Sequence, residues 1–288
     1  MNHKIALFAD VHGNTTALEA VIEDTIREKV TDYWFLGDLI MPGPGSANLL
    51  ALLKRINTSV YVKGNWEDCL LEVLDGQVDL NDPSDIYIAR LVQYQCQSLK
   101  NAELELLKQL PIHTTKTING LNISIAHNLP DKNYGGDLVP DQTQQNFDRL
   151  FTQKNCDVAI YAHVHHQMMR YSSEDQLIIN PGSVGQPYFK WAKHRADRRA
   201  QYAILEIDEK GLVQINFKKV SYDVNKELEE AKRESIPYIT LYKEQLETGK
   251  THTHDKDFLK EINQRFGYEK DVVEFLKDIG AESTAHRS

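Results

Sequence analysis

Residues 4–12 read KIALFADVH, an apolar run that ends in two polar side chains, Asp10 and His12. Four later apolar runs, YWFLGD, SVYVKGN, LNISIAH and DVAIYAHVH, end in the same way. Their polar residues are Asp38, Asn65, His127, His163 and His165. A short apolar run bounded by turn residues predicts a buried strand, so each polar side chain lies where a strand reaches the surface. Because binding sites are often built from loops at strand ends, we expect these five loops to form one site.

The seven side chains supply imidazole, carboxylate and amide ligands, enough to hold two divalent metal ions if the loops converge. Asp10-x-His12 and His163-x-His165 each skip one residue, which at a strand end points both side chains the same way. A carboxylate such as Asp38 can bridge two cations about 3.5–4 Å apart, an arrangement that binds the attacking and leaving oxygens of a phosphoryl group. The ligand types favour two transition-metal ions, manganese, iron or zinc, over magnesium or calcium.

Each of the five polar motifs at the strand ends, here called blocks, has a structural explanation when it is taken alone. Gly-Asp and Gly-Asn are usually turns, and a single His after a strand is more often a hydrogen-bonded residue than a ligand. Five blocks in one order are far more specific. This order resembles the calcineurin-like metallophosphoesterase superfamily, whose pattern reads D-x-H, G-D, G-N-H-[DE], [GA]-H and G-H-x-H. Residues 180–187, NPGSVGQP, resemble its prokaryotic small phosphodiesterase branch.

The resemblance covers roughly residues 4–250 and implies both a fold and a ligand assignment. The implied fold is α/β, a four-layer αββα sandwich of two mixed sheets with a dinuclear metal site at one edge. One metal ion is then held by Asp10, His12, Asp38 and His165. The second is held by Asp38, Asn65, His127 and His163, and we assign catalytic roles to Asp38, Asn65 and His127.

Trp66 departs from the family pattern, which has His after Gly-Asn. The resemblance implies that this His lies near the scissile phosphate and assists the leaving group. An indole N–H cannot supply a proton near neutral pH, so esters with poor alkoxide leaving groups should react slowly. A phosphoanhydride needs little protonation, because its leaving group is itself a phosphate. Trp66 therefore favours nucleoside polyphosphates and offers a face for stacking on a base, or else it only fills space beside the metals.

Four further residues are predicted to contact substrate. Arg195 and Arg198 belong to a basic cluster. The cluster is either a binding surface for phosphates remote from the metals or a solvated surface loop. The other members are Lys190, Lys193, His194 and Arg199. Tyr188 adjoins the cluster and either stacks on a base or anchors the loop. Asn14 follows the first ligand pair, where its amide either contacts a substrate oxygen or caps the first helix.

The first half of the chain alternates apolar strands with helices, which indicates parallel βαβ units. The pattern predicts a helix over residues 15–29, and a helical insertion near the site over residues 68–110. Strands are expected to resume near residues 121, 157, 177, 201 and 213 with tighter spacing, typical of a more antiparallel sheet. We predict a metallophosphoesterase domain over residues 1–222 and a C-terminal helical appendage over residues 223–288. A further His-x-His, at His252 and His254, lies in a polar stretch without a carboxylate block, which disfavours a metal role.

Composition limits the partners. Of the 288 residues, 41% are hydrophobic and 26% are charged, as in an ordinary globular protein. The net charge of −9 disfavours nonspecific binding to nucleic acid, because phosphate backbones are repelled. Three cysteines without metal-ligand spacing predict a reducing, cytoplasmic compartment. No apolar run approaches the length of a membrane span, and a homo-oligomer is compatible with the composition.

The sequence thus predicts a metal-dependent hydrolase of nucleotide phosphoanhydrides or phosphodiesters that acts by a metal-activated hydroxide. A dinucleoside polyphosphate of the diadenosine tetraphosphate type is the first choice of substrate. One alternative is a phosphodiesterase acting on cyclic nucleotides or a broader range of diesters. Another is a catalytically silent scaffold, because the resembled superfamily includes the retromer subunit, which also lacks the His replaced by Trp66.

Overall fold

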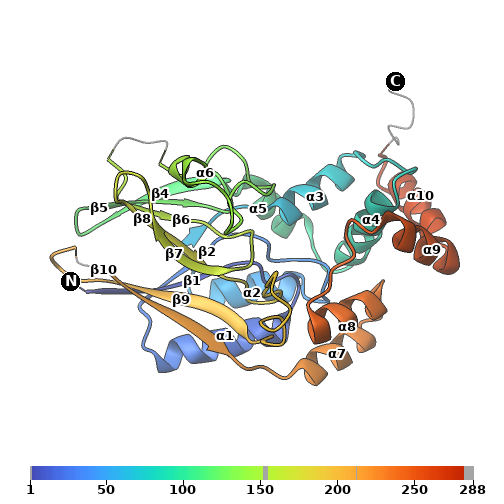
Figure 1. Ribbon diagram of the computed structural model, residues 1–288. Helices are drawn as coiled ribbons and strands as arrows, with labels where there is room; N and C mark the ends of the chain where they lie inside the picture. Colours follow the sequence, from blue (N-terminus) through green and yellow to red (C-terminus); the bar gives the residue numbers. More distant parts are fainter. Residues whose placement is uncertain (1, 152–154, 212, 282–288) are drawn as a thin grey trace.

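The computed structural model describes residues 2–151, 155–211 and 213–281, and it contains two five-stranded sheets packed face to face (Figure 1). The first sheet has the order β10 (Val213–Val220), β9 (Ala200–Ile207), β1 (His3–Phe8), β2 (Asp32–Phe35), β3 (Val60–Tyr61). The second has the order β4 (His113–Ile118), β5 (Leu121–Ala126), β6 (Val158–Ile160), β8 (Leu177–Pro181), β7 (Gln167–Tyr171). In the first sheet β1, β2 and β3 pair in parallel, and β9 and β10 are antiparallel to their neighbours. In the second sheet the central strands β5, β6 and β8 pair in parallel and the edge strands β4 and β7 pair antiparallel, so both sheets are mixed, as predicted.

The parallel pairs bring the predicted site loops to one edge. Strands β1 and β2 run in the same direction with Phe8 opposite Phe35, and the loops that follow them stay paired. The backbone N–H of Asp10 donates to Gly37 O at 2.9 Å, and that of His12 donates to Asp38 O at 3.1 Å. The carboxyl ends of parallel strands therefore deliver both loops to the same place.

The loop over residues 182–187, which follows β8, joins the edges of the two sheets. Val184 N donates to Ala9 O at 3.0 Å, Gly185 N donates to Asp10 O at 2.9 Å, and the Ser183 hydroxyl donates to the same Asp10 carbonyl at 2.8 Å. Residues 180–187, which include this loop, are the stretch that resembles the prokaryotic phosphodiesterase branch. Its backbone fixes the end of β1 against the second sheet.

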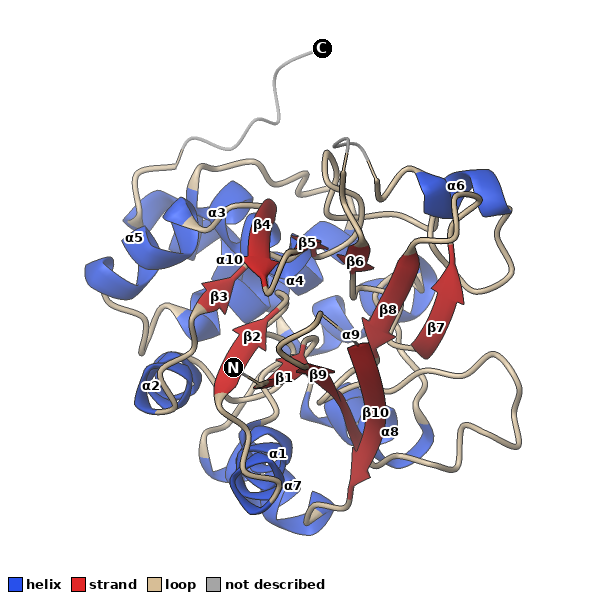
Figure 2. Cartoon of the chain, turned by 90° about the vertical axis from the view of Figure 1, so that its left-hand side faces the viewer, coloured by secondary structure: helices blue, strands red, loops and turns tan. Residues whose placement is uncertain are grey.

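Alternating apolar residues explain the layers. In β1, Ile5 and Leu7 pack between the sheets against residues such as Ile125 and Ile160, whereas Ala6 and Phe8 face the helices. Helices α1 (Thr15–Arg27) and α2 (Ala47–Arg55) cover the outer face of the first sheet. The short helix α6 (Gln144–Asp148) and neighbouring loops cover the second (Figure 2). The predicted four-layer fold is confirmed, with a thin fourth layer.

Two details of the predicted elements differ from the structure. The first helix ends at Arg27 rather than at residue 29, and Ile26 in its last turn is 62% exposed. Strands β4 and β7 were not predicted. Both are edge strands with several polar or partly exposed residues, so they lack the apolar runs that mark the central strands.

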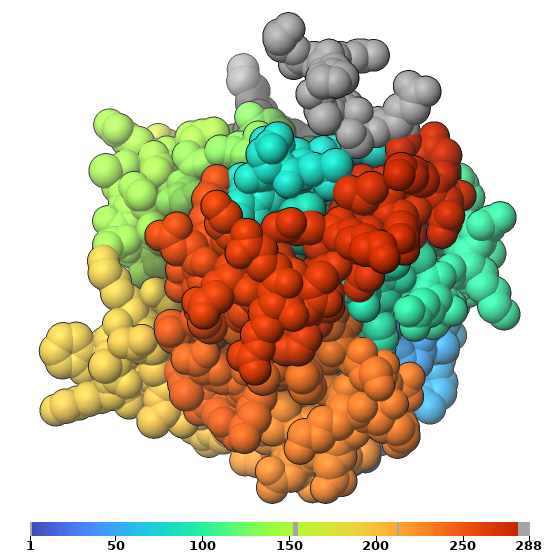
Figure 3. Space-filling view, turned by 90° about the vertical axis from the view of Figure 1, so that its right-hand side faces the viewer, coloured from blue at the N-terminus to red at the C-terminus, as the bar shows by residue number. Residues whose placement is uncertain are grey.

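Seven further helices lie outside the sheet layers within the described residues. They are α3 (Asn65–Leu74), α4 (Pro83–Gln95), α5 (Asn101–Gln109), α7 (Val224–Arg233), α8 (Ile239–Thr248), α9 (Lys256–Phe266) and α10 (Tyr268–Asp278). Helices α9 and α10 pack against α4, and their Leu259 and Val272 belong to the same apolar cluster as Phe8. On the face shown in Figure 3, these orange and red C-terminal helices lie against the cyan and teal helices of the insertion. The division into residues 1–222 and 223–288 stays a prediction.

Glu227 of α7 links the C-terminal helices to the start of α1. Its side chain is fully buried and accepts hydrogen bonds from Thr16 N at 2.9 Å and from the Tyr242 hydroxyl at 2.8 Å. Thr16 lies in the first turn of α1, where free N–H groups and the helix dipole favour a negative charge. A residue from the C-terminal segment therefore completes the cap of a helix that begins directly after the first metal-ligand loop.

Replacing Glu227 with Ala should lower the free energy of unfolding by about 2–4 kcal/mol, because each buried donor left without a partner costs about 1–3 kcal/mol. Urea unfolding followed by circular dichroism measures this change. Tyr242→Phe is the matched control: it removes one donor and leaves Thr16 satisfied, so its effect should be roughly 1 kcal/mol. Equal, small effects of the two substitutions would contradict the capping role.

Candidate metal centre

Six of the seven predicted ligands meet in two groups that share one carboxylate. Asp10, His12, Asp38 and His165 have ligand atoms within 4.8 Å of one another, and so have Asp38, His127 and His163. The structure brings the seventh, Asn65, to the wall of a cavity that His163 and His165 also line. The ligand role of all seven stays a prediction.

Asp38 lies between the two groups. Its Oδ2 is 3.2 Å from His127 Nε2 and 3.7 Å from His12 Nε2. Its other oxygen, Oδ1, accepts the backbone N–H of Trp66 at 2.9 Å, which fixes the plane of the carboxylate. Oδ2 is therefore the atom placed to contact cations on both sides.

Unpartnered oxygens in the cluster match the requirements of a cation. Both carboxylate oxygens of Asp10 and the amide oxygen of Asn65 are buried without a hydrogen-bond partner in the described residues. Asp10 Oδ1 lies 3.3 Å from His165 Nε2 and 4.0 Å from His12 Nε2. Buried carboxylates are normally paired or coordinate metals, and this set of oxygen and imidazole ligands suits divalent transition metals.

Three histidines are oriented by backbone carbonyls. The Nδ1–H groups of His12, His127 and His165 donate to Met41 O at 2.9 Å, Leu36 O at 2.7 Å and Gln186 O at 2.7 Å. The Nε2 atom of each ring then faces the cluster, and His12 Nε2 lies 3.1 Å from His165 Nε2. Such outer hydrogen bonds fix the tautomer and the ring orientation of metal-binding histidines.

The backbone of the site is strained. Five of the seven predicted ligands have a left-handed backbone conformation, with φ between 52° and 65°: Asp10, His12, Asp38, His163 and His165. This region is unfavourable for residues other than glycine and persists where surrounding contacts hold it, most often at functional sites. Gly64 has an ordinary extended backbone and is required for a steric reason, since a Cβ atom there would overlap Oδ1 of Asp38.

Glu67 is a site residue that sequence reasoning did not assign. Its buried carboxylate accepts the backbone N–H groups of Asp38 at 2.9 Å, Leu39 at 2.8 Å and Gly64 at 2.9 Å. Burial and the nearby charge of Asp38 raise the pKa of Glu67 to about 7. A Glu three residues after the start of a helix is the signal that was available, because a capping Glu reaches back to the first N–H. Here that side chain also positions the Asp38 loop.

The charges of the cluster shift several pKa values in the metal-free protein. Burial by itself lowers the pKa of His127, but the adjacent Asp38 outweighs this and raises it to about 10. Burial likewise raises the pKa of Asp38, but His127 and His12 outweigh it and lower the value. Burial and a neighbouring imidazole lower the pKa of His12 and of His163 to about 4.

Metal binding to the metal-free protein should therefore release protons. Near neutral pH His127 carries a proton, which a metal ion must displace before Nε2 can bind it. Because this pKa is raised, the competing proton is lost as pH rises toward 10, and the apparent metal affinity should increase by up to roughly tenfold per pH unit. Titration calorimetry with Mn²⁺ or Zn²⁺ in buffers of different ionisation enthalpy counts the protons. Heats that do not depend on the buffer would contradict the expectation.

A cavity of about 380 Å³ opens beside the metal centre. Of the predicted substrate residues, Trp66, Tyr188 and Arg198 line it. The Trp66 ring meets His12 edge to face, with ring centroids 5.6 Å apart. The predicted aromatic and cationic groups therefore share one cavity with the metal ligands.

The structure places the other predicted substrate residues elsewhere. Asn14 caps α1: its Oδ1 accepts from Ala17 N at 2.9 Å and its Nδ2 donates to the Tyr222 hydroxyl at 3.1 Å. Arg195 is partly buried outside the lining of the cavity. Within the rest of the basic cluster, Lys190 pairs with Asp141 at 3.1 Å and Arg199 pairs with Asp197 at 2.8 Å. Substrate contacts of Asn14 and Arg195 stay predictions.

One wall of the cavity was missed by sequence reasoning. It is formed by the end of α8 and the connection to α9, with the residues Gln245, Gly249, Thr251, Thr253 and His254. Cys69 and Ile88, from the helical insertion, line another side. Only His254 belongs to a pattern noted in the sequence, the His-x-His for which a metal role was disfavoured, and its neighbour His252 contacts Glu244 at 2.8 Å. The other positions carry no local pattern, because the residues they meet at the cavity are distant in sequence.

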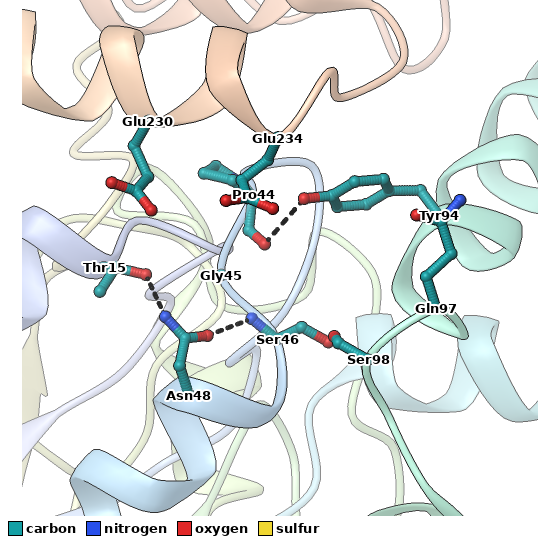
Figure 4. A pocket seen from close by; sticks show the side chains of 10 residues that line it. All are labelled: Thr15, Pro44, Gly45, Ser46, Asn48, Tyr94, Gln97, Ser98, Glu230 and Glu234. Atoms are coloured by element: carbon teal, nitrogen blue, oxygen red, sulfur yellow. Dashed lines mark hydrogen bonds between the residues drawn. The ribbon is translucent and has the colours of Figure 1, made fainter.

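A second cavity, of about 500 Å³, lies between the starts of α1 and α2, the end of α4, and α7 (Figure 4). Glu230 and Glu234 extend from α7 toward Thr15, Gly45 and Ser46. None of the seven predicted metal ligands lines it. We therefore place the chemistry at the smaller cavity.

Comparison with known proteins agrees with this geometry. Residues 3–210 match the model of the calcineurin-like phosphoesterase superfamily domain, and the chain belongs to this family. It is accordingly a hydrolase that acts on phosphoester bonds, and the family uses divalent metal ions. Among the described residues no helix has both the length and the apolarity needed to cross a membrane.

Several individual proteins are similar. An uncharacterized protein of Methanocaldococcus jannaschii is 27% identical over 248 residues, which is 81% of this chain and 93% of that protein. The symmetrical bis(5'-nucleosyl)-tetraphosphatase of Salmonella arizonae is 38% identical over 81 residues, but these cover only 27% of this chain and 28% of that enzyme. A hypothetical protein of Pyrococcus horikoshii has a similar fold, with a TM-score of 0.70 and 20% identity over 86% of this chain and 99% of its own. The metallophosphoesterase of Sphaerobacter thermophilus has a TM-score of 0.62 and 23% identity over 86% of this chain and 100% of its own.

Proposed function

We propose that this hydrolase cleaves nucleotide phosphoanhydrides, with dinucleoside polyphosphates of the diadenosine tetraphosphate type as its preferred substrates. The proposal includes two divalent transition-metal ions, manganese, iron or zinc, held by the seven predicted ligands. Bound ions of this kind supply Lewis acidity and an activated water for in-line attack on phosphorus.

The roles of the chain's own residues follow from their positions. Asp38 Oδ2 lies between the two groups of imidazoles and would help to hold both metal ions, while its Oδ1 accepts the backbone N–H of Trp66. His127 is fixed by Leu36 O and presents Nε2 to Asp38. Asn65 contributes a buried, unpartnered oxygen without adding charge. We assign catalytic roles to Asp38, Asn65 and His127, because Asp38 is the shared carboxylate, His127 Nε2 lies 3.2 Å from it, and Asn65 lines the cavity.

Trp66 is the observation that carries the choice of bond. Its ring lies against His12 and lines the cavity, at the position where the family pattern has a His. An indole cannot supply a proton to a leaving group, so the site is suited to leaving groups that are stable as anions. A phosphate leaving group meets this condition. The local similarity to a bis(5'-nucleosyl)-tetraphosphatase supports the same substrate class.

Turnover assays test the proposal. The protein is incubated with Mn²⁺, Fe²⁺, Co²⁺ or Zn²⁺ and with diadenosine tetraphosphate, cyclic AMP or bis(p-nitrophenyl) phosphate, and products are identified by chromatography. The highest kcat/KM is expected for diadenosine tetraphosphate. Preference for cyclic AMP or the synthetic diester would instead support the phosphodiesterase alternative, and no turnover with any metal would support the scaffold alternative.

A further inference from the structure

Three hydrogen-bond donors in the wall of the metal-side cavity have no partner in the described residues. They are Nε of Arg198 and the amide Nε2 atoms of Gln186 and Gln245. The side chains of Gln186 and Gln245 belong to residues that are only 7% and 5% exposed. Buried donors in native proteins are almost always satisfied, by protein, ordered water or ligand. Three such donors around one cavity are therefore available to a bound group or to ordered water.

These three residues are here called the donor corner, and Arg198 links the segments that carry the other two. Arg198 donates from Nη1 to Pro187 O at 2.6 Å, directly after Gln186, and from Nη2 to the backbone O of Gln245 at 3.3 Å. Gly249 packs on the guanidinium so closely that a Cβ atom there would overlap Nη1. All three members line the cavity together with His163 and His165. The donor corner thus joins the loop after β8 to the end of α8.

The donor corner has no carboxylate in direct ion-pair contact among the described residues, and burial of Arg198 outweighs the attraction of nearby Asp197 in its effect on the pKa of the guanidinium. Arg198 forms no ion pair in the part of the chain that the structure describes, because the nearest acid in sequence, Asp197, pairs with Arg199 at 2.8 Å and with Lys219 at 2.9 Å. The pKa of Arg198 is lowered as a result. A partly buried guanidinium is favourable when an anion neutralises it, and its planar fork suits phosphate oxygens.

We infer that the donor corner binds a substrate phosphate other than the one attacked at the metal centre. This inference rests on the proposed function and deepens it, because it requires a substrate with at least two phosphates. The lining of the cavity also includes Trp66 and Ile88, which are suited to an apolar or aromatic group. A cyclic nucleotide, with one phosphate, would leave the donor corner without a partner.

The binding test uses the metal-free protein, so that it does not depend on turnover. Isothermal titration calorimetry measures the affinity for inorganic pyrophosphate of the wild type, Gln245→Met and Arg198→Met. Both variants should bind at least about tenfold more weakly, because hydrogen bonds to charged groups are the strong ones. Arg199→Met is the matched control, since its guanidinium pairs with Asp197 outside the cavity, and its affinity should not change.

Thermal stability separates binding from a structural role. The Nε2 of Gln245 has no partner within the fold, so Gln245→Met should keep or raise Tm while it weakens pyrophosphate binding. Arg198→Met also removes two hydrogen bonds to backbone carbonyls and can therefore destabilise the fold. Gln245→Met is for this reason the decisive variant. The inference is overturned if the wild type does not bind pyrophosphate, if Gln245→Met binds it equally well, or if Gln245→Met lowers Tm without changing binding. Equal, corner-dependent binding of malonate would overturn the assignment to phosphate.

A kinetic measurement distinguishes failure of this inference from failure of the proposed function. With metal added, Gln245→Met should raise KM for diadenosine tetraphosphate about tenfold and should affect kcat/KM for bis(p-nitrophenyl) phosphate much less. Equal effects on both substrates would overturn the second phosphate position. Absence of wild-type turnover would refute the proposed function, whereas pyrophosphate binding would still report on the donor corner.

Discussion

Asp38→Asn is expected to reduce metal content and activity together. Its Oδ1 accepts the Trp66 N–H, so an amide at this position should keep its oxygen there and turn its NH₂ group toward His127 and His12. An NH₂ group donates hydrogen bonds and cannot bind a cation. We expect kcat/KM to fall by roughly 100-fold or more, since changes even outside the ligand set commonly cost about 10–100-fold in metal affinity or activity.

Metal content by plasma emission spectroscopy measures the first effect, and turnover measures the second. His12→Ala removes a ligand of one group only, so it should leave one metal ion largely in place. Asp141→Asn is the surface control, because Asp141 is exposed and pairs with the exposed Lys190, and it should change neither quantity. Two retained metal ions and near-normal turnover in Asp38→Asn would end the bridging assignment.

Trp66→His should change which leaving groups the enzyme tolerates. Wild-type rates should fall steeply as the leaving group becomes more basic, because no proton is supplied from this position. The substitution should raise rates on alkyl phosphates by about 10²–10⁴-fold, the typical contribution of a positioned acid. The substitution should also weaken the binding of base-bearing substrates by roughly 1–3 kcal/mol if the indole stacks on the base.

A series of esters and anhydrides of increasing leaving-group pKa measures the slope for each variant. Trp66→Phe is the matched control: it keeps an aromatic face without an acid, so the slope should stay steep. A wild-type enzyme that hydrolyses alkyl phosphates as readily as anhydrides would show that another group donates the proton. Glu67 is a poor substitute for that role, because both of its oxygens accept backbone N–H groups away from the cavity lining.

The central strands and the metal-ligand loops could be predicted because their signals are local. Strand β1 is buried on both faces, so Ile5, Leu7 and Phe8 belong to an uninterrupted apolar run. Asp10 lies where this run ends. Parallel pairing then determines which loops meet. The edge strand β4 has its polar residues Thr115, Lys116 and Thr117 exposed, so nothing in its composition separates it from a loop.

The remaining parts of the site depend on contacts between distant segments. Gln245 and Gly249 reach the cavity only because α8 packs beside the loop that carries Arg198, and no spacing rule connects residues so far apart. The basic cluster shows the same limit. Arg198 and Arg199 are adjacent in sequence, yet one lines the cavity and the other pairs with Asp197.

The metal-ligand residues and the wall formed by the connection between α8 and α9 come from different parts of the chain. All seven predicted ligands fall inside the matched residues 3–210, whereas Gln245, Gly249, Thr251, Thr253 and His254 lie beyond them. Relatives can therefore inherit the same reaction and still differ in what they accept, if their C-terminal segments differ. A chimaera that carries the C-terminal segment of a relative should keep the bond chemistry of this chain and take on the substrate range of the donor.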